Sequence, residues 1–230
     1  MKIIDAHSHI DYISHKIQPN VVGTVVCATK ESEWNNLIDI GHQDDRVYCA
    51  FGIHPWFIDM VDMGYESRLE QLLKTDSNYM VGEIGIDKNH LDMDRQIDIF
   101  TRQFDVAIKM QRNVFVHCVG AWDKMLHILK QYKKSDLPII IFHGFMGDEN
   151  VVKHLIKNYG DKIYFSFGKN ALYGENRRIT QIDYNKILVE SDGKFDSNLV
   201  DVMNKIIDLK NNKNIPEIIY NNTQRVLHHE

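Results

Sequence analysis

Residues 80–118 read MVGEIGIDKNHLDMDRQIDIFTRQFDVAIKMQRNVFVHC, and this stretch decides the fold. It begins with a short, largely apolar run, Met80–Ile84, and reaches Leu91–Met110 after a polar segment. Apolar side chains recur in Leu91–Met110 at three- and four-residue spacing, which is typical of an amphipathic helix. A second apolar run, Val114–Cys118, follows, and continuous runs are typical of parallel strands buried on both faces. The stretch therefore predicts a strand, a crossover helix and a second, parallel strand.

The same alternation recurs along the 230 residues. The predicted strands are Lys2–Ala6, Gly23–Ala28, Val47–Gly52, Met80–Ile84, Val114–Cys118, Pro138–Phe142, Lys162–Phe167 and Ile187–Glu190. The predicted helices are Glu31–Ile40, Arg68–Lys74, Leu91–Met110, Trp122–Tyr132, Glu149–Tyr159 and Asn198–Lys210. This alternation indicates an α/β protein, a (β/α)8 TIM barrel in a single domain over residues 1–230, with a doubly wound open sheet as the alternative.

Two of the connections between predicted strands are short. About a dozen residues, Ile10–Val21, separate the first two strands, which is too few for a full crossover helix. The stretch Leu172–Asp183 also leaves room for only a short helix. We therefore expect the first and seventh helices of the barrel to be reduced.

Composition limits the function. Hydrophobic residues make up 43% and charged residues 26% of the chain, which excludes a disordered or fibrous protein. The net charge of −5 argues against a protein that coats nucleic acid or an anionic membrane by bulk charge. The three cysteines lie in apolar surroundings, as expected of buried, reduced thiols in a cytoplasmic protein. The sequence shows neither a signal segment nor a membrane-spanning segment, and it points to no stable protein partner.

Polar side chains that can bind metal ions stand where the predicted strands end. They are His7, His9, Glu83, His117, His143 and Asp192. In a barrel the carboxyl ends of all the strands face one mouth, so residues far apart in sequence converge there. His7 and His9 are two residues apart, which places both imidazoles on the same side of an extended strand. We expect the six side chains to line one cavity.

The chemistry of this set predicts a metal centre. Without a cation the two carboxylates would repel each other, and the imidazoles would be desolvated with few partners. Two divalent ions remove both problems, and a bridging Glu83 could hold them about 3.5–4 Å apart. Mixed nitrogen and oxygen ligands favour Zn²⁺ or Mn²⁺, whereas Mg²⁺ would keep water ligands. The identity of the ions stays open among Zn, Mn and Mg.

Other histidines and the cysteine beside His117 have simpler interpretations. Cys118 follows His117, so a Cys/His nucleophile is conceivable, but neighbours in a strand point to opposite sides and favour a core thiol. Six other histidines are interpreted as structural: His42, His90, His127, His154, His228 and His229. Cations just beyond the strand ends could contact a substrate or simply face solvent; they are Lys30, Lys88, Lys169, Arg177, Arg178 and Lys194. Trp56 and Tyr173 could stack on a base or pack at the rim.

The motifs at the strand ends resemble those of the TatD family of metal-dependent deoxyribonucleases, a branch of the amidohydrolase-like barrels. Asp5–Asp11 resembles the family's D-x-H-x-H-L/I-D, Gly52–Pro55 its G-I-H-P, and Val81–Asp87 its I/V-G-E-I-G-L-D. Further similar segments are Gln96, Phe100 and Gln103 on the next helix, Val116-His117, His143–Gly147, Val189–Asp192 and Asn222–Arg225. The matches follow the family's order over nearly the whole chain.

The resemblance implies a role for each matching residue. His7 and His9 would bind one metal ion together with Asp192, and Glu83 would bridge it to a second ion held by His117 and His143. His54 would lie near the substrate phosphate. The activity implied is hydrolysis of phosphodiester bonds in DNA.

The chain departs from the family on the substrate side. Val119 stands where family members usually carry arginine, and Trp56 replaces the second histidine of G-I-H-P-H. The family's Arg-Asn-Glu-Pro loop after the last strand is absent, since Gly193 and Lys194 follow Asp192 directly. Hydrolase chemistry is therefore predicted more firmly than a DNA substrate.

The reaction that we expect is attack of a metal-bound hydroxide on phosphorus. Asp192 would act as the base for the attacking water as well as a ligand, and Glu83 would hold both ions. The substrate would be DNA or another phosphodiester. Two alternatives stay open: a metal-dependent hydrolase of a non-nucleic-acid ester or amide, and a barrel that binds a ligand without turnover.

Overall fold

The eight predicted strands form one parallel barrel sheet. The computed structural model describes residues 1–13, 20–173, 176–194 and 198–228. The strands are β1 (Ile3–Ser8), β2 (Val21–Cys27), β3 (Val47–Phe51), β4 (Met80–Asp87), β5 (Val114–Val119), β6 (Ile140–Phe142), β7 (Ile163–Phe167) and β8 (Ile187–Val189). They pair in the order β1 to β8, each parallel to the next. This sequential order confirms the barrel and makes the doubly wound alternative wrong, because the order of strands never reverses.

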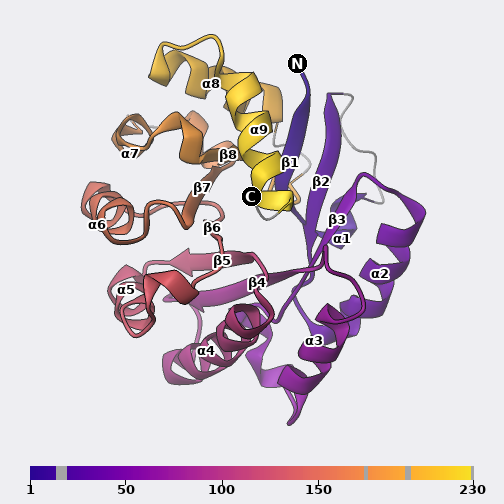
Figure 1. Ribbon diagram of the computed structural model, residues 1–230. Coiled ribbons are helices and arrows are strands. Elements are labelled where there is room, and N and C mark those ends of the chain that lie inside the picture. The colour runs from indigo at the N-terminus through magenta and orange to yellow at the C-terminus, as the bar shows by residue number, and fades with distance from the viewer. Residues whose placement is uncertain (14–19, 174–175, 195–197, 229–230) are drawn as a thin grey trace.

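Helices surround the strands on the outside (Figure 1). They are α1 (Ile10–Ile13), α2 (Trp34–Gln43), α3 (Tyr65–Leu73), α4 (Met93–Met110), α5 (Trp122–Leu129), α6 (Glu149–Tyr159), α7 (Arg177–Gln181), α8 (Leu199–Lys210) and α9 (Ile215–Leu227). The first and seventh are the reduced ones, with four residues in α1 and five in α7. The expectation drawn from the two short connections is thereby confirmed.

The ends of the sheet meet at the strand that carries His7. The N–H of Asp192, just after β8, donates to the carbonyl oxygen of His7 at 3.0 Å. The N–H of Ser191 donates to Asp5 Oδ1 at 2.9 Å. These bonds bring residues from the two ends of the chain side by side and close the barrel.

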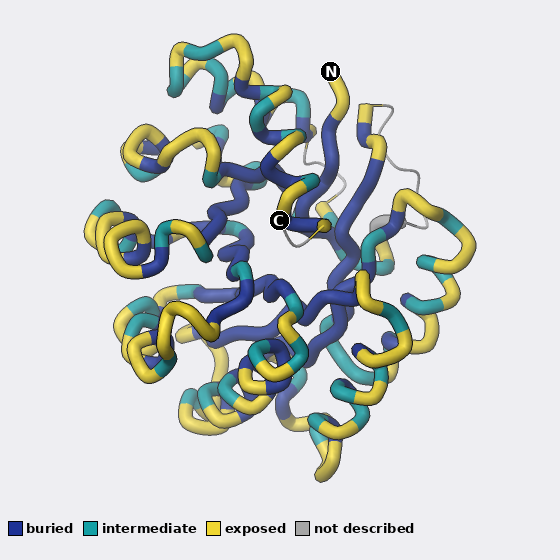
Figure 2. Tube along the Cα trace, viewed as in Figure 1, coloured by how far each residue is buried: buried dark blue, intermediate teal, exposed yellow. Residues whose placement is uncertain are grey.

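The interior of the barrel is filled by one apolar layer from all eight strands. Its strand residues are Ile4, Val25, Ala50, Met80, Phe115, Ile141, Tyr164 and Leu188. Val226 and Leu227 of α9 join this layer, and Asn113 donates its side-chain N–H to the carbonyl oxygen of Val226 at 2.6 Å. The amino ends of the strands are therefore covered by α9, and the carboxyl ends remain for the polar side chains. Figure 2 shows this buried interior inside a ring of helices whose outer faces are exposed.

The three cysteines, Cys27, Cys49 and Cys118, are buried free thiols, as predicted. Within the described ranges, no helix combines the length and the apolar composition that crossing a bilayer requires. The loop residues 195–197, where the family's Arg-Asn-Glu-Pro segment would begin, lie outside the described residues.

Candidate metal centre

Glu83 lies at the middle of the predicted ligand set. Its Oε2 atom is 3.2 Å from His7 Nε2 and 3.5 Å from His9 Nε2. Its Oε1 atom is 2.9 Å from His117 Nδ1 and 2.7 Å from His143 Nε2. Each carboxylate oxygen thus faces its own group of imidazoles, which suits a carboxylate that bridges two metal ions.

Asp192 completes the group around His7 and His9. Its Oδ1 atom lies 3.9 Å from His7 Nε2 and 3.6 Å from His9 Nε2. Asp192 has a positive φ of 56°, and this turn directs its carboxylate back toward β1. The structure therefore brings together all six side chains that the sequence predicted as ligands.

His54 was expected near the substrate phosphate, but its imidazole also contacts the predicted ligand Glu83. Its Nε2 atom is 3.2 Å from Glu83 Oε1, and its Nδ1 atom accepts a hydrogen bond from the N–H of Trp56 at 3.1 Å. One ligand atom each of His54, Glu83 and His117 lie within 4.8 Å of one another, as do those of His7, Glu83 and His143 and those of His7, His9 and Asp192. Each of these three groups could hold a metal ion.

The electrostatics of the cluster suit cations. Burial by itself raises the pKa of the Glu83 carboxyl, but the positive charges of His143, His54 and His7 hold that pKa well below its usual value. Burial and the neighbouring His143 lower the pKa of His7, which favours its neutral, metal-binding form. His7 Nε2 is buried and makes no hydrogen bond within the described part of the chain. An ionised carboxylate and a neutral imidazole with a free lone pair fit a divalent ion.

The neighbouring carboxylates favour the protonated form of two other imidazoles. Burial lowers the pKa of His143, but the charge of Glu83 and a hydrogen bond to Glu190 outweigh it and raise the pKa well above its usual value. Burial also lowers the pKa of His9, and the hydrogen bond to Asp192 and the charge of Glu83 again raise it overall. The carboxylates thus draw positive charge into the site, and metal binding would displace these protons.

A second layer of contacts fixes the orientation of each imidazole. His9 Nδ1 lies 3.1 Å from the carbonyl oxygen of Cys27, and His7 Nδ1 lies 3.4 Å from Cys27 Sγ. His117 Nε2 is 3.3 Å from Asp87 Oδ2, and His143 Nδ1 is 3.6 Å from Glu190 Oε1. In all four rings one nitrogen faces the cluster while the other faces a fixed partner, as is usual for metal-binding histidines.

Asp87 and Glu190 were missed as site residues by the sequence reasoning. Both belong to motifs at strand ends that the analysis singled out, so the signal was present. Each touches a predicted ligand only through that ligand's far ring nitrogen, and the orientation of a ring cannot be inferred from sequence spacing.

The structure does not support the hypothesis that Cys118 is a nucleophile. It supports the interpretation of Cys118 as a thiol of the core. Cys118 is 5% exposed and packs in the apolar cluster between strands and helices. Burial raises the pKa of its thiol well above the usual value, so the reactive thiolate is disfavoured.

Backbone contact also fixes the spacing of the strands that carry Glu83 and His117. Gly85 pairs with His117 across β4 and β5. A Cβ atom added at Gly85 would lie 1.9 Å from the carbonyl oxygen of His117. Only glycine allows this approach of the two chains, because any side chain would push the strands apart.

The cluster opens into a cavity of about 660 Å³. Lys30, Trp56, Phe57, Met146 and Lys194 are among the residues of its wall. Trp56 is 53% exposed, yet its indole N–H donates to Asp87 Oδ2 at 2.8 Å and its ring stacks on His90 at 5.8 Å between centroids. Trp56 is thus a fixed aromatic surface at the rim, and His90 supports it.

The other candidate substrate contacts divide into two groups. Lys169 and Arg178 line a second cavity beside the cluster, and Arg177 lines a third, more open one. Lys88 and Tyr173 line none of these three cavities in the described part of the chain. Lys88 packs near Gly120, and Tyr173 is 64% exposed.

A parallel eight-stranded barrel with histidines and carboxylates gathered at the carboxyl ends of its strands defines the class of (β/α)8 barrels with a candidate metal centre at that end. Within this class the chain belongs to the TatD-related DNase family, whose model matches residues 4–228. The resemblance seen in the motifs is thereby confirmed.

Several curated proteins are similar to parts of the chain. The human protein named 3'-5' RNA nuclease TATDN2 is 27% identical over 169 residues, which are 70% of this chain and 21% of that protein. The 3'-5' ssDNA/RNA exonuclease TatD of Rahnella is 31% identical over 105 residues, 45% of this chain and 40% of that one. The chain thus spans less than half the length of these two relatives.

Solved structures share the fold over nearly the full length of the chain. The crystal structure of the TatD homologue YjjV from Escherichia coli has a TM-score of 0.85 at 22% identity and covers 97% of both chains. A TatD family hydrolase from Entamoeba histolytica has a TM-score of 0.81 at 14% identity, with 98% of both chains covered. At these identities the likeness supports the fold.

Proposed function

We propose that residues 1–230 form one metal-dependent hydrolase domain that cleaves phosphodiester bonds in single-stranded nucleic acid, DNA in the first place. The observation that carries this proposal is the position of Glu83, whose Oε2 atom faces His7 and His9 while its Oε1 atom faces His54, His117 and His143. Relatives named as exonucleases of single-stranded DNA and RNA support the choice of substrate. The three buried thiols are consistent with the cytoplasm as its compartment.

The residues around Glu83 would hold two divalent ions. His7, His9 and Asp192, one of the three groups close enough to hold an ion, would bind one ion. His117 and His143, which share Glu83 Oε1, would bind the other, and Glu83 would contribute to both. When bound, such ions lower the pKa of water so that a nucleophile exists at neutral pH, and they stabilise negative charge on phosphoryl oxygens.

Asp192 and His54 would handle the proton and the substrate. The Asp192 side chain is 26% exposed, so its carboxylate can reach a water molecule in the cavity. Hydrogen bonding to His9 and the charges of His143 and His7 overcome the effect of burial and hold the pKa of Asp192 well below its usual value, so this carboxylate is ionised at neutral pH. His54, beside Glu83 and open to the cavity, would orient a phosphate oxygen.

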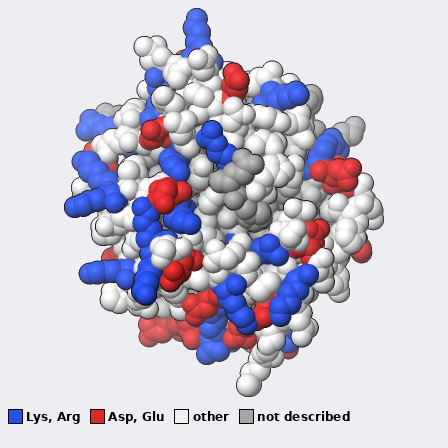
Figure 3. Space-filling view, in the orientation of Figure 1, with Lys and Arg blue, Asp and Glu red and all other residues white. Residues whose placement is uncertain are grey.

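The distribution of surface charge indicates that a polyanion would be attracted at the mouth of the barrel and not over the whole surface. Figure 3 shows Lys and Arg interspersed with Asp and Glu over the face in view. Two divalent ions would add four positive charges against the two negative charges of Glu83 and Asp192, so the mouth can be positive in a chain of net charge −5. The fixed indole of Trp56 offers a face on which an unpaired base can stack.

The test compares wild type with Glu83→Gln on four substrates. These are a single-stranded DNA oligonucleotide, an RNA of the same sequence, a lactone and a phosphomonoester, each with Mn²⁺, Zn²⁺ or Mg²⁺ added after chelator treatment. We expect hydrolysis of the oligonucleotides, a loss of at least about 100-fold in Glu83→Gln, and a fall in bound metal from about two equivalents per chain. Glu217→Gln on the exposed side of α9 is the matched control.

Each contrary outcome points to a different function. Turnover of the lactone alone would favour an ester or amide hydrolase. Equal background hydrolysis by wild type and Glu83→Gln with every ion would favour a barrel that binds without turnover. A Glu83→Gln variant that retains two equivalents of metal would rule out the bridging role.

A further inference from the structure

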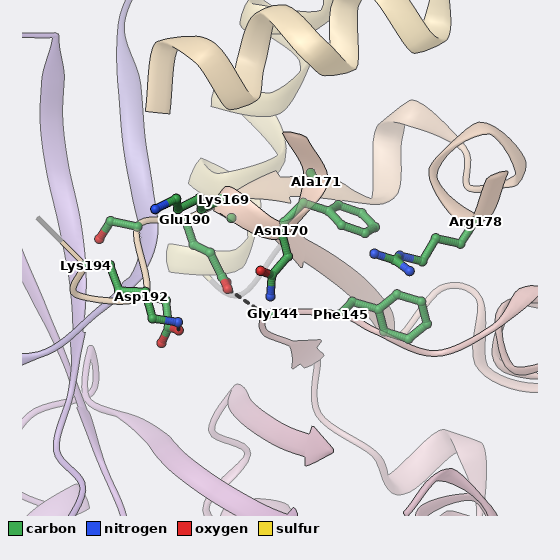
Figure 4. Close-up of a pocket in the computed structure, with 12 residues that line it drawn as sticks. Gly144, Phe145, Lys169, Asn170, Ala171, Arg178, Glu190, Asp192 and Lys194 are labelled. Atoms are coloured by element: carbon green, nitrogen blue, oxygen red, sulfur yellow. Dashed lines mark hydrogen bonds and ion pairs between the residues drawn. The ribbon is translucent and has the colours of Figure 1, made fainter. Parts of the chain in front are cut away.

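A small cavity lies directly beside the metal centre. It measures about 50 Å³ and lies between the carboxyl ends of β7 and β8, the segment after β6, and α7. Gly144, Asn170, Asp192 and Lys194 line both this side cavity and the main one. Figure 4 shows Arg178 reaching in from one side, Asp192 and Lys194 on the other, and Asn170 between them.

Arg178 enters this side cavity without an anionic partner among the described residues. Its guanidinium Nη2 donates to Met146 Sδ at 3.3 Å, and a thioether is a weak acceptor. Its Nε atom is buried and forms no hydrogen bond. Among the described residues, none places a carboxylate oxygen within 4.0 Å of the guanidinium, and burial lowers its pKa. The side chain is half-buried and its Nε atom fully so, and a partly desolvated cation without a counter-charge is a suitable partner for an incoming anion.

The carboxylates on the opposite side are already engaged. Glu190 Oε1 accepts a hydrogen bond from the N–H of Gly144 at 2.6 Å. Asp192 Oδ2 pairs with Lys194 Nζ at 2.5 Å. Glu190 Oε2 is buried without a hydrogen bond, which keeps an anion away from that wall. The place for an incoming anion is therefore the Arg178 end of the side cavity.

The side cavity of about 50 Å³ admits one small group. At about 30 Å³ per water molecule, this volume corresponds to roughly two waters, which is too small for a nucleobase and leaves room for part of a phosphate group. The planar fork of a guanidinium matches two phosphate oxygens at once. A third cavity of about 410 Å³, lined by Arg177, Arg178 and Met146 among others, continues outward from this point.

We propose that Arg178 holds a second phosphate of the substrate, the neighbour of the one that is cleaved at the metal centre. This inference rests on the proposed function. Because the side cavity adjoins the main one, a nucleotide chain with one phosphate at the cluster can place the next phosphate beside Arg178. Arg178 would thus supply from α7 the cation that Val119 does not supply from β5. The substrate class is therefore an oligonucleotide with at least two phosphates.

The first test compares substrates that differ by one phosphate. They are the dinucleotide TpT and its forms with one additional phosphate at the 5′ or the 3′ end. We expect wild type to prefer one phosphorylated form by about 10- to 100-fold in kcat/KM, and Arg178→Gln to lose that preference, so that kcat/KM for the phosphorylated form falls much further than kcat/KM for TpT. Arg102→Gln, an exposed arginine on α4, removes the same charge elsewhere and should behave as wild type.

The second test needs no catalysis. Binding of a labelled single-stranded oligonucleotide to chelator-treated protein is followed by fluorescence anisotropy at increasing salt. Arg178→Gln should reduce the slope of log K against log salt by about 0.7, the value for one phosphate contact, and Arg178→Lys should restore part of it. Urea unfolding checks that the variants are folded.

The two tests separate failure of this inference from failure of the proposed function. Suppose that wild type cleaves oligonucleotides. If Arg178→Gln then lowers kcat/KM equally for TpT and for its phosphorylated forms, or lowers kcat/KM for none of them, the second phosphate site is excluded. If wild type cleaves none of them but its oligonucleotide binding depends on Arg178, the anion site stands and the nuclease function fails. An unchanged salt slope in Arg178→Gln overturns the inference in either case.

Discussion

Asp87 joins a predicted metal ligand to the rim of the cavity. Its Oδ2 atom lies 3.3 Å from His117 Nε2 and accepts the indole N–H of Trp56 at 2.8 Å. The hydrogen bond to His117 holds the pKa of Asp87 well below its usual value, so this carboxylate is ionised. The charge fixes the ring of His117 with Nδ1 toward Glu83.

Asp87→Asn is therefore expected to weaken metal binding without unfolding the barrel. An amide keeps the shape but removes the charge that orients His117, and loss of such a partner typically costs about 10- to 100-fold in metal affinity. Competition with a coloured chelator measures the affinity, and Asp45→Asn on the exposed surface is the control. Equal affinity of Asp87→Asn and wild type would exclude the orienting role.

Cys49 makes the stability of the protein sensitive to alkaline pH. Burial raises the pKa of its thiol from 9.0 to about 12. Above pH 9 the unfolded chain loses this proton while the folded chain keeps it, so the free energy of unfolding falls as pH rises. The loss begins near the unfolded pKa and ends near the folded one.

Cys49→Ala should flatten this dependence. For one proton the difference in slope from wild type is up to about 1.4 kcal/mol per pH unit, between about pH 9 and 11. Urea unfolding at several pH values measures it. Parallel profiles for the two proteins would show that Cys49 does not titrate in this way.

At the scale of elements, α4 holds two loops of the site through buried glutamines. Gln103 Oε1 accepts the N–H of Ile53 at 2.7 Å, and its Nε2 donates to the carbonyl oxygen of the same residue at 3.1 Å. Gln96 makes the same pair of bonds to Asp87, at 2.7 and 3.1 Å. One helix thus fixes the backbone beside His54 and at Asp87.

Gln103→Leu should destabilise the protein by about 2–4 kcal/mol, because it leaves the buried N–H and carbonyl of Ile53 without partners. The free energy of unfolding in urea measures this loss. Gln71→Leu on the exposed face of α3 is the matched control and should change stability by less than about 0.5 kcal/mol. A Gln103→Leu variant as stable as this control would show that the hydrogen bonds of Gln103 to Ile53 do not stabilise the fold.

The elements also show where sequence reasoning succeeds and where it does not. Strand positions were predicted because buried parallel strands are continuous apolar runs, but β4 extends to Asp87 instead of ending at Ile84. Glycine lowers the strand propensity of a sequence, so the strand was predicted to end before Gly85. In the structure, Gly85 and Asp87 pair with β5, and this pairing extends β4 to Asp87. The helix α9 was not predicted, since Ile215–Leu227 contains proline, two asparagines and threonine. Burial of Ile219, Val226 and Leu227 stabilises it instead.

The same distinction applies to the site. The convergence of six ligands follows from barrel topology, which strand order alone determines. The partners of their rings, Asp87 and Glu190, depend on side-chain rotation in the folded protein. The three-dimensional structure was needed to find them.

At the scale of the whole molecule, the two ends of the barrel have different tasks. The amino ends are filled by apolar side chains and covered by α9, whereas the carboxyl ends carry the charged cluster. Apolar burial provides most of the stability of a domain. The fold should therefore form without ions.

Metal removal is expected to lower stability but to preserve secondary structure. At free metal concentrations of about 100 to 1,000 times Kd, binding adds about 2.7–4.1 kcal/mol, which chelation would remove. Far-UV circular dichroism and thermal unfolding, with and without chelator, measure the two effects. Glu83→Gln should show little of this metal-dependent shift. Unfolding on chelation would show that the apolar interior alone does not stabilise the fold. An unchanged unfolding temperature would show that bound metal does not add to its stability.

The close approach of Gly85 to His117 has a consequence for how members of this family diverge. The main chain, not a side chain, sets the distance between the strands that carry Glu83 and His117. Point substitutions therefore cannot easily widen or narrow the reaction centre. New specificities are expected to arise by exchange at the periphery, at positions such as Trp56, Val119 and Arg178, while the inherited chemistry persists unchanged.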